Sequence, residues 1–231
     1  PPLWLRVNKL KLDREAYRNK EVLEPGSGVG CNLLSLAELP GRFVGVEPVT
    51  VYRQLTPIFA EREGLRAPEI VAGECEQLPF ASGQFDVVLC YSAHQYMDVR
   101  TGIREMARVL RPGGQLRVFG GAFGSFVCGA TQRLLQRRKL GALKHDLLAV
   151  ANTVGYEWLG RRVAVPRSAG STAAPVYPRI SSMQRWISDA GLRLRRDIPR
   201  RVGVETGYVA DKIGLVLAGF VNQFAELALL L

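Results

Sequence analysis

The sequence predicts an α/β domain built on a doubly wound, mostly parallel sheet with helices on both faces. Short apolar runs of strand type alternate with helical segments over residues 21–120, in the order β-α-β-α-β-β-α-β. The first run ends in an acidic residue and leads into three alternating glycines, Gly26, Gly28 and Gly30. This turn is typical of nucleotide-type binding, because glycine adopts positive φ and lets a ligand approach the backbone at a helix start.

Each element of this half has its own sequence signal. Buried strands are expected where β-branched and aromatic residues cluster, at 21–23, 43–46, 70–71, 85–90 and 115–119. Helices are expected where apolar residues recur at helical spacing and a glycine or proline follows, at 31–39, 50–63 and 102–110.

The pattern changes after Gly120. We expect a substrate-recognition insert at 121–180, and after it a capped helix at 181–190, strands at 192–198 and 213–220, and a helical tail at 221–231. Residues 1–20 are expected to form an N-terminal arm, and 21–231 a single domain. The stretch 213–231 approaches the length of a membrane span. Asn222, Gln223 and Glu226 interrupt it, so a packed or interfacial element is expected, with peripheral membrane contact open.

Composition narrows the class of protein. The 231 residues are 47% hydrophobic and 23% charged, as in ordinary globular chains. The four cysteines form no CxxC pair and only two histidines are present, so neither a metal site nor a disulfide scaffold is expected. No secretory signal is recognised. These features favour a reducing, cytoplasmic setting.

The net charge of +10 is unevenly distributed. Residues 1–115 contain 14 basic and 14 acidic residues, so the whole excess lies after residue 115. A basic half suggests an acidic substrate, a nucleic acid or a lipid surface as partner, or a solvated face without a ligand. The arginines of the insert suit carboxylate or phosphate. The insert offers few aromatics among them, so RNA is not favoured.

Several features in order distinguish this chain from a dinucleotide-binding one. Glu24 precedes the glycine turn, Glu74 and Glu76 follow the third strand, and the strand at 85–90 is followed by the segment RVLRPGG at 108–114. Together they resemble the class I S-adenosylmethionine-dependent methyltransferases, especially the ubiquinone- and menaquinone-biosynthesis C-methyltransferases. The resemblance covers about residues 21–120. It implies a seven-stranded sheet with an antiparallel last strand, and methyl transfer from S-adenosylmethionine to a small-molecule or lipid-like acceptor.

The resemblance also implies roles for individual residues. Glu24 serves the methionine portion of the cofactor, whose charge is positive, and Glu47 accepts both ribose hydroxyls. The full set of expected cofactor contacts is Glu24, Pro25, Gly26, Ser27, Gly28, Gly30, Glu47, Pro48, Glu74, Cys75, Glu76 and Tyr91. The alternative for the carboxylates is a solvated position in a loop. As a surface carboxylate at a strand end, Glu47 is expected to contribute little to stability.

Catalysis of methyl transfer needs mainly alignment of the acceptor with the methyl group. A general base is needed only where the acceptor loses a proton, and His94, after the fourth strand, is the candidate. Its alternatives are a substrate contact and a wall of the cofactor pocket. The acceptor atom and the oligomeric state stay open.

Two other functions remain as alternatives, an RNA-modifying methyltransferase and a non-catalytic cofactor-binding protein. Residues 1–8 resemble a segment that precedes the catalytic domain of bacterial rRNA cytosine-C5 methyltransferases. The cysteines that those enzymes need after the fourth and fifth strands are absent at the corresponding positions, which excludes that chemistry here.

Overall fold

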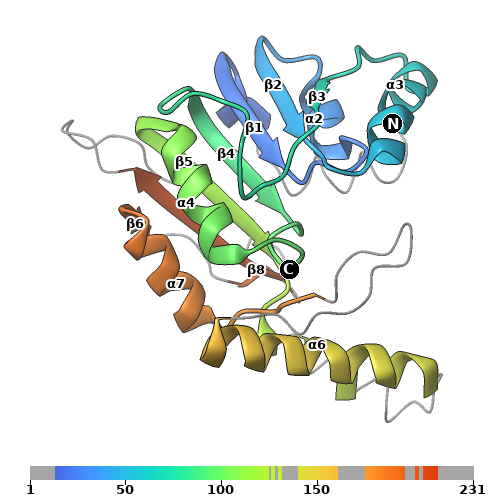
Figure 1. The fold of residues 1–231 in the computed structure, drawn as a ribbon. Helices are drawn as coiled ribbons and strands as arrows, with labels where there is room; N and C mark the ends of the chain where they lie inside the picture. The colour runs from blue at the N-terminus through green and yellow to red at the C-terminus, as the bar shows by residue number, and fades with distance from the viewer. Residues whose placement is uncertain are drawn as a thin grey trace.

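A computed structural model describes residues 14–124, 126–127, 130–131, 140–160, 175–195, 201–202 and 205–212. Its centre is a sheet with the strand order β3-β2-β1-β4-β5-β8-β6, and the short strand β7 pairs with β8 (Figure 1). The middle residues of the central strands are apolar and buried, among them Val22, Leu23, Val88 and Leu89, as expected for parallel strands covered on both faces. This order brings the ends of β1, β2 and β4 to one edge of the sheet.

Five strands run parallel to one another: β1 Lys20–Pro25, β2 Gly41–Val46, β3 Glu69–Val71, β4 Phe85–Tyr91 and β5 Leu110–Gly120. The antiparallel strand β8 spans Glu205–Lys212 and separates β5 from β6 Leu192–Leu194, while β7 spans Arg201–Val202. The predicted fold class, a mostly parallel doubly wound sheet whose last main strand is antiparallel, is confirmed.

The helical segments are η1 Arg14–Tyr17, α2 Cys31–Leu36, α3 Thr50–Arg62, α4 Val99–Val109, α6 Leu140–Leu159 and α7 Ile180–Asp189. A large core cluster packs α4 and α7 against the sheet, and a smaller one packs η1 and α2 against it. Helix α6 lies across the end of the sheet towards which β4 runs (Figure 1). Of the helices in the described ranges, none is long and apolar enough to cross a membrane.

Several predicted boundaries were wrong. The helix expected at 31–39 ends at Leu36, because the chain must turn before entering β2 at Gly41. The helix expected at 181–190 is α7, but no side chain caps its N-terminus. The strand expected at 192–198 is described only over Leu192–Leu194.

The antiparallel strand lies at Glu205–Lys212, a segment that was not predicted to be a strand. Charged residues lie at both ends of this strand and obscure its apolar pattern in the sequence. The residues at its centre, Tyr208 and Ala210, are buried. The Lys212 ammonium donates to the carbonyls of Ala107 at 2.8 Å and Leu110 at 2.5 Å, at the end of α4. The strand and tail predicted within 213–231 lie outside the described residues.

The end of the predicted N-terminal arm packs on the sheet. Tyr17 is fully buried, its hydroxyl accepts a hydrogen bond from Arg117 at 2.9 Å, and the Arg117 guanidinium lies 4.8 Å from the centre of its ring. Lys20 already belongs to β1. The rest of the arm, residues 1–13, lies outside the described ranges.

Candidate cofactor and acceptor site

The glycine turn closes the end of β1 and is packed on one side only. A Cβ atom on Gly26, whose φ is 69°, would overlap the Cβ of Ala93, so this position tolerates only glycine. Gly28 also has a positive φ, 56°, but a Cβ there would meet nothing within 4 Å. The turn therefore has a close-packed floor and an open side, which is the shape of a cradle for a ligand.

Glu24 is a buried carboxyl group at this turn. Its side chain is 1% exposed, and its Oε1 accepts a hydrogen bond from Asn32 Nδ2 at 2.5 Å. Its Oε2, like the nearby Ser27 Oγ, is buried without a hydrogen-bond partner among the described residues. Burial raises the pKa of Glu24 to about 8, against the opposing effect of the Asn32 bond. A buried carboxyl group with one unsatisfied oxygen is suited to a cationic ligand group.

Glu47 lies beside the same turn and is held by backbone donors. Its Oε2 accepts from the Gly28 N–H and its Oε1 from the Val49 N–H, both at 2.9 Å. The expectation of a surface carboxylate with little structural weight was wrong, because the residue is only 5% exposed and satisfies two backbone groups. Each carboxylate oxygen keeps acceptor capacity for a ligand hydroxyl.

The three expected adenine contacts diverge in the structure. Cys75 is buried, and its Sγ lies 3.9 Å from the position of a Cβ on Gly26, so it borders the turn. Burial raises the pKa of its thiol well above the ordinary value. Glu74 is exposed, whereas Glu76 Oε1 accepts from the Asp98 N–H at 2.6 Å and so points to the start of α4.

His94 is buried against the segment that follows β5. Its Nε2 lies 3.4 Å from the Gly121 carbonyl oxygen, and its Cε1 lies 2.5 Å from where a Cβ on Gly120 would be. Its Nδ1 is buried and has no partner among the described residues. Burial lowers the pKa of His94 to about 4, so the ring is neutral at pH 7. Tyr91, half-buried, has its ring 6.3 Å from that of Phe119.

Both ends of the insert reach the segment that carries His94. The Val176 N–H donates to the Gln95 carbonyl at 2.8 Å, and the rings of Phe126 and Tyr177 stack with their centres 4.3 Å apart. Tyr177 also packs on Gly121. Sequence reasoning missed Gln95 and Tyr177, and the only signal for them was their position next to His94 and at the end of the insert.

Asp98 links the cofactor segment to α6. Its side chain caps α4 by accepting from the Thr101 N–H at 2.9 Å, and the same Oδ1 accepts from the Tyr156 hydroxyl of α6 at 3.1 Å. Its own N–H is the group that donates to Glu76. Sequence reasoning missed Asp98 as well, although an aspartate directly before a helix is a recognised capping signal.

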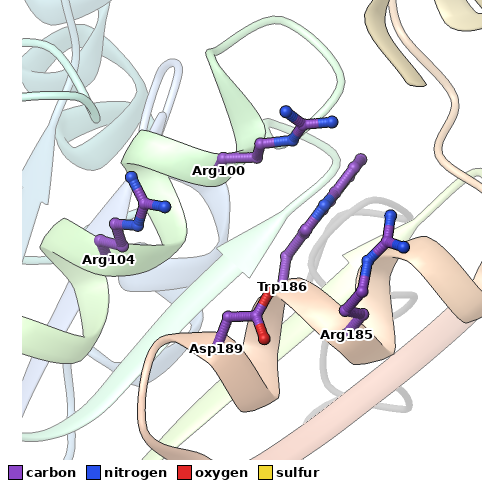
Figure 2. Close-up of a pocket in the computed structure, with 5 residues that line it drawn as sticks. All are labelled: Arg100, Arg104, Arg185, Trp186 and Asp189. Atoms are coloured by element: carbon purple, nitrogen blue, oxygen red, sulfur yellow. The ribbon is translucent and has the colours of Figure 1, made fainter. Parts of the chain in front are cut away.

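A hollow of about 250 Å³ lies elsewhere, between α4 and α7, as Figure 2 shows. No expected cofactor residue lines it. Its lining residues are Arg100, Arg104, Arg185, Trp186 and Asp189. The Arg100 guanidinium lies 5.0 Å from the ring centre of Trp186 and 5.3 Å from that of Tyr156, so this side chain joins α4, α6 and α7.

Comparison with known proteins identifies the domain. Residues 23–118, which include the glycine turn, Glu24, Glu47 and His94, match the family described as a methyltransferase domain. Over these residues the chain is therefore similar to a methyltransferase domain. The resemblance inferred from the sequence is confirmed.

Relatives of the methyltransferase domain carry related names. The chain is 49% identical over 148 residues to the demethylmenaquinone methyltransferase of Corynebacterium glutamicum, which covers 63% of this chain and 54% of that protein. It is 36% identical over 100 residues to a phthiotriol/phenolphthiotriol dimycocerosates methyltransferase of Mycobacterium ulcerans, covering 42% and 36%. The matched segments span about half or less of the curated relatives, so they describe the domain and not the whole of those proteins.

Solved structures agree with the methyltransferase fold. The crystal structure of YcgJ from Bacillus subtilis superposes with a TM-score of 0.57 at 20% identity, over 82% of this chain and 70% of that one. At this identity the likeness shows the fold alone.

Proposed function

We propose that the protein transfers a methyl group from S-adenosylmethionine to a small, lipid-like acceptor. The observation that carries the proposal is Glu24, a buried carboxyl group at the glycine turn with one unsatisfied oxygen. S-adenosylmethionine has an ammonium and a sulfonium but no phosphate, and when bound it supplies a methyl group already activated for attack. A buried carboxylate repays its desolvation only beside such a positive charge.

The remaining contacts fit the other parts of the cofactor. Gly28 leaves open space beside the backbone, and Glu47 offers two fixed carboxylate oxygens to a ribose diol. Cys75 borders the turn as an apolar wall for the adenine. Glu74 and Glu76 take a smaller part, because Glu74 is exposed and Glu76 is already bonded to Asp98.

The names of the relatives support a lipid-like acceptor, and the packing of the insert supports its role in recognising that acceptor. The relatives named above include a demethylmenaquinone and a phthiotriol/phenolphthiotriol dimycocerosates methyltransferase. In addition, the insert at 121–180 meets the His94 segment through Val176 and Tyr177, and its helix α6 lies across the end of the sheet (Figure 1). We assign acceptor recognition to this insert.

His94 is assigned to the acceptor side of the site. Its free Nδ1 is a hydrogen-bond acceptor on a neutral ring, suited to hold a hydroxyl of the acceptor. With its pKa lowered to about 4, the ring is a weak base. His94→Ala should therefore lower turnover while it leaves cofactor affinity nearly unchanged.

The test is calorimetric titration with S-adenosylmethionine, followed by transfer of labelled methyl groups to a demethylmenaquinone. Glu24→Gln should weaken cofactor binding at least tenfold, about 1.4 kcal/mol or more. Glu61→Gln, an exposed glutamate on α3, is the matched control and should bind as the parent does. Absence of heat with the parent would refute the cofactor. Binding without transfer to any lipid-like acceptor would refute the reaction and favour a non-catalytic cofactor-binding protein.

A further inference from the structure

Helix α6 turns large apolar side chains outward and buries several polar groups, alongside the buried Ala149 and Tyr156. Its outward side chains include Leu147, Val154 and Trp158, which are 61%, 47% and 77% exposed and recur at helical spacing. Its inward side chains include Asn152, Thr153 and Tyr156, all buried. A helix on a water-facing surface normally shows the opposite arrangement, since burial of apolar area is the main gain from packing.

The inward polar groups are satisfied, so this arrangement is built into the fold. Thr153 Oγ1 donates to the Ala149 carbonyl at 2.8 Å and accepts from the Tyr177 N–H at 3.0 Å. The Tyr156 hydroxyl donates to Asp98 and accepts from the Arg100 N–H at 3.0 Å. The orientation of α6 is thereby fixed, and it leaves a large tryptophan and two aliphatic side chains facing outward.

Positive charge adjoins the C-terminal end of this helix. Arg100 donates to the Tyr156 carbonyl, and its guanidinium lies 3.4 Å from where a Cβ on Gly160 would be, directly after α6. Arg104 and Arg185 border the same hollow (Figure 2), and neither forms an ion pair or hydrogen bond through its side chain among the described residues. Asp189 is the one acidic side chain of the lining.

We propose that the outward face of α6, with the arginine-lined hollow beside it, docks on an anionic lipid bilayer. Apolar side chains with a tryptophan, next to cationic groups, match the acyl boundary and the anionic headgroups of such a surface. Charge complementarity selects this occupant over a second copy, because two copies would bring like-charged arginine clusters towards each other. Glu157, a residue of α6, is already bonded to Arg179 and adds little negative charge.

The test is co-sedimentation of the full chain with phosphatidylcholine vesicles that either contain or lack phosphatidylglycerol. The parent should bind the anionic vesicles, and added salt should weaken the binding. The double variant Leu147→Ser with Trp158→Ser should bind the vesicles at least about tenfold more weakly. The reason is that neither position then places an apolar side chain in the acyl boundary. Arg104→Gln and Arg185→Gln should each weaken binding about fivefold.

Matched controls come from the far side of the sheet. Ile58→Ser on α3 removes a side chain that is 59% exposed, and Arg66→Gln removes an exposed arginine; both should leave vesicle binding unchanged. Retained circular dichroism and melting temperature would show that every variant is folded. The emission of the parent should shift to the blue on adding anionic vesicles, and that shift should vanish in Trp158→Phe.

Three results would overturn the proposal. The first is no binding to anionic vesicles, or binding that the α6 and arginine variants leave intact. The second is protection of Trp158 from a soluble quencher, in the absence of lipid, that increases with protein concentration. This result would mean that a second copy of the chain covers this face. The third is protection of Trp158 at all protein concentrations that is lost when the chain is truncated after Lys212. This result would mean that residues 213–231 cover the outward face of α6. Methyl transfer to a soluble acceptor is a separate measurement and can succeed or fail independently.

Discussion

Helices α4 and α6 both lie near the site, yet they are held in place by opposite kinds of side chain. Helix α4 buries Ile103 and Met106 against the sheet and turns its charged residues outward. Helix α6 buries Thr153 and Tyr156 and turns apolar residues outward. The first arrangement draws its stability from apolar burial, and the second from a few hydrogen bonds of defined geometry. Helix α4 is therefore part of the core along its length, whereas among the described residues of α6 the core cluster includes Tyr156.

The largest expected effect is on the core helix. Ile103→Ala should lower the free energy of unfolding by about 2–5 kcal/mol, because it opens a cavity among fully buried residues. Val154→Ala on α6 should change it by no more than about 0.5 kcal/mol. Urea denaturation of both variants measures the contrast, and equal losses would contradict the distinction between the two helices.

The second prediction concerns Glu47, a buried polar residue in the sheet half. Glu47→Ala should weaken binding of S-adenosylmethionine by about tenfold to a thousandfold, from the loss of two charge-assisted hydrogen bonds. It should also lower the free energy of unfolding by about 1–3 kcal/mol, because the Gly28 and Val49 N–H groups lose their acceptor. Calorimetry and urea denaturation measure the two effects. Glu69→Ala, at an exposed position on β3, is the control and should change neither.

A third prediction concerns the Tyr156 hydroxyl, which holds α6 against the start of α4. Tyr156→Phe deletes the hydroxyl that bonds Asp98 and the Arg100 N–H, at an expected cost of about 1–3 kcal/mol. Hydrogen exchange should accelerate over residues 146–160 and stay slow over 103–109. Trp158→Phe, two residues away on the exposed face, should leave both rates unchanged. Acceleration in both helices would show that α6 is as much a part of the core as α4.

The fourth prediction is a pH dependence. Because burial raises the pKa of Glu24 to about 8, the folded protein favours the protonated form, and stability is lost as the pH rises from the unfolded value of about 4.3 towards 8. The loss approaches about 1.4 kcal/mol per pH unit in that window. Glu24→Gln should remove this slope, and below pH 4 the two proteins should show the same pH dependence. Urea denaturation across the pH range tests it, and parallel curves from pH 5 to 8 would contradict it.

The sheet and the position of Glu24 and Glu47 at one edge of it were predictable because both follow from local patterns. Apolar runs mark β1 to β5, and the ends of parallel strands meet at one edge, which brings Glu24 and Glu47 together. Strand β8 was not predictable in this way. Its charged residues make it look like a loop. The Lys212 contacts with the end of α4 and the hydrogen bond from Gln115 to Asp211 explain how two of them are accommodated.

The acceptor side was much less predictable. The positions of Tyr177 against Gly121 and of Asp98 against Tyr156 depend on how the insert packs, which no short sequence pattern encodes. The faces of α6 were a further obstacle. Apolar periodicity identifies the side of a helix that avoids water, and the usual inference places that side in the core. For α6 that inference is wrong, because its large apolar side chains are exposed.

Asp98 has a consequence for how the two ends of the site communicate. Its backbone N–H donates to Glu76, which follows Cys75 at the border of the glycine turn, and its carboxylate accepts from Tyr156 of α6. A ligand that draws Glu76 away disturbs the residue that anchors α6, and a surface that pulls α6 outward disturbs Glu76. If the two events are linked through this residue, thermodynamics requires reciprocity: the factor by which lipid contact changes cofactor affinity equals the factor by which cofactor changes lipid affinity.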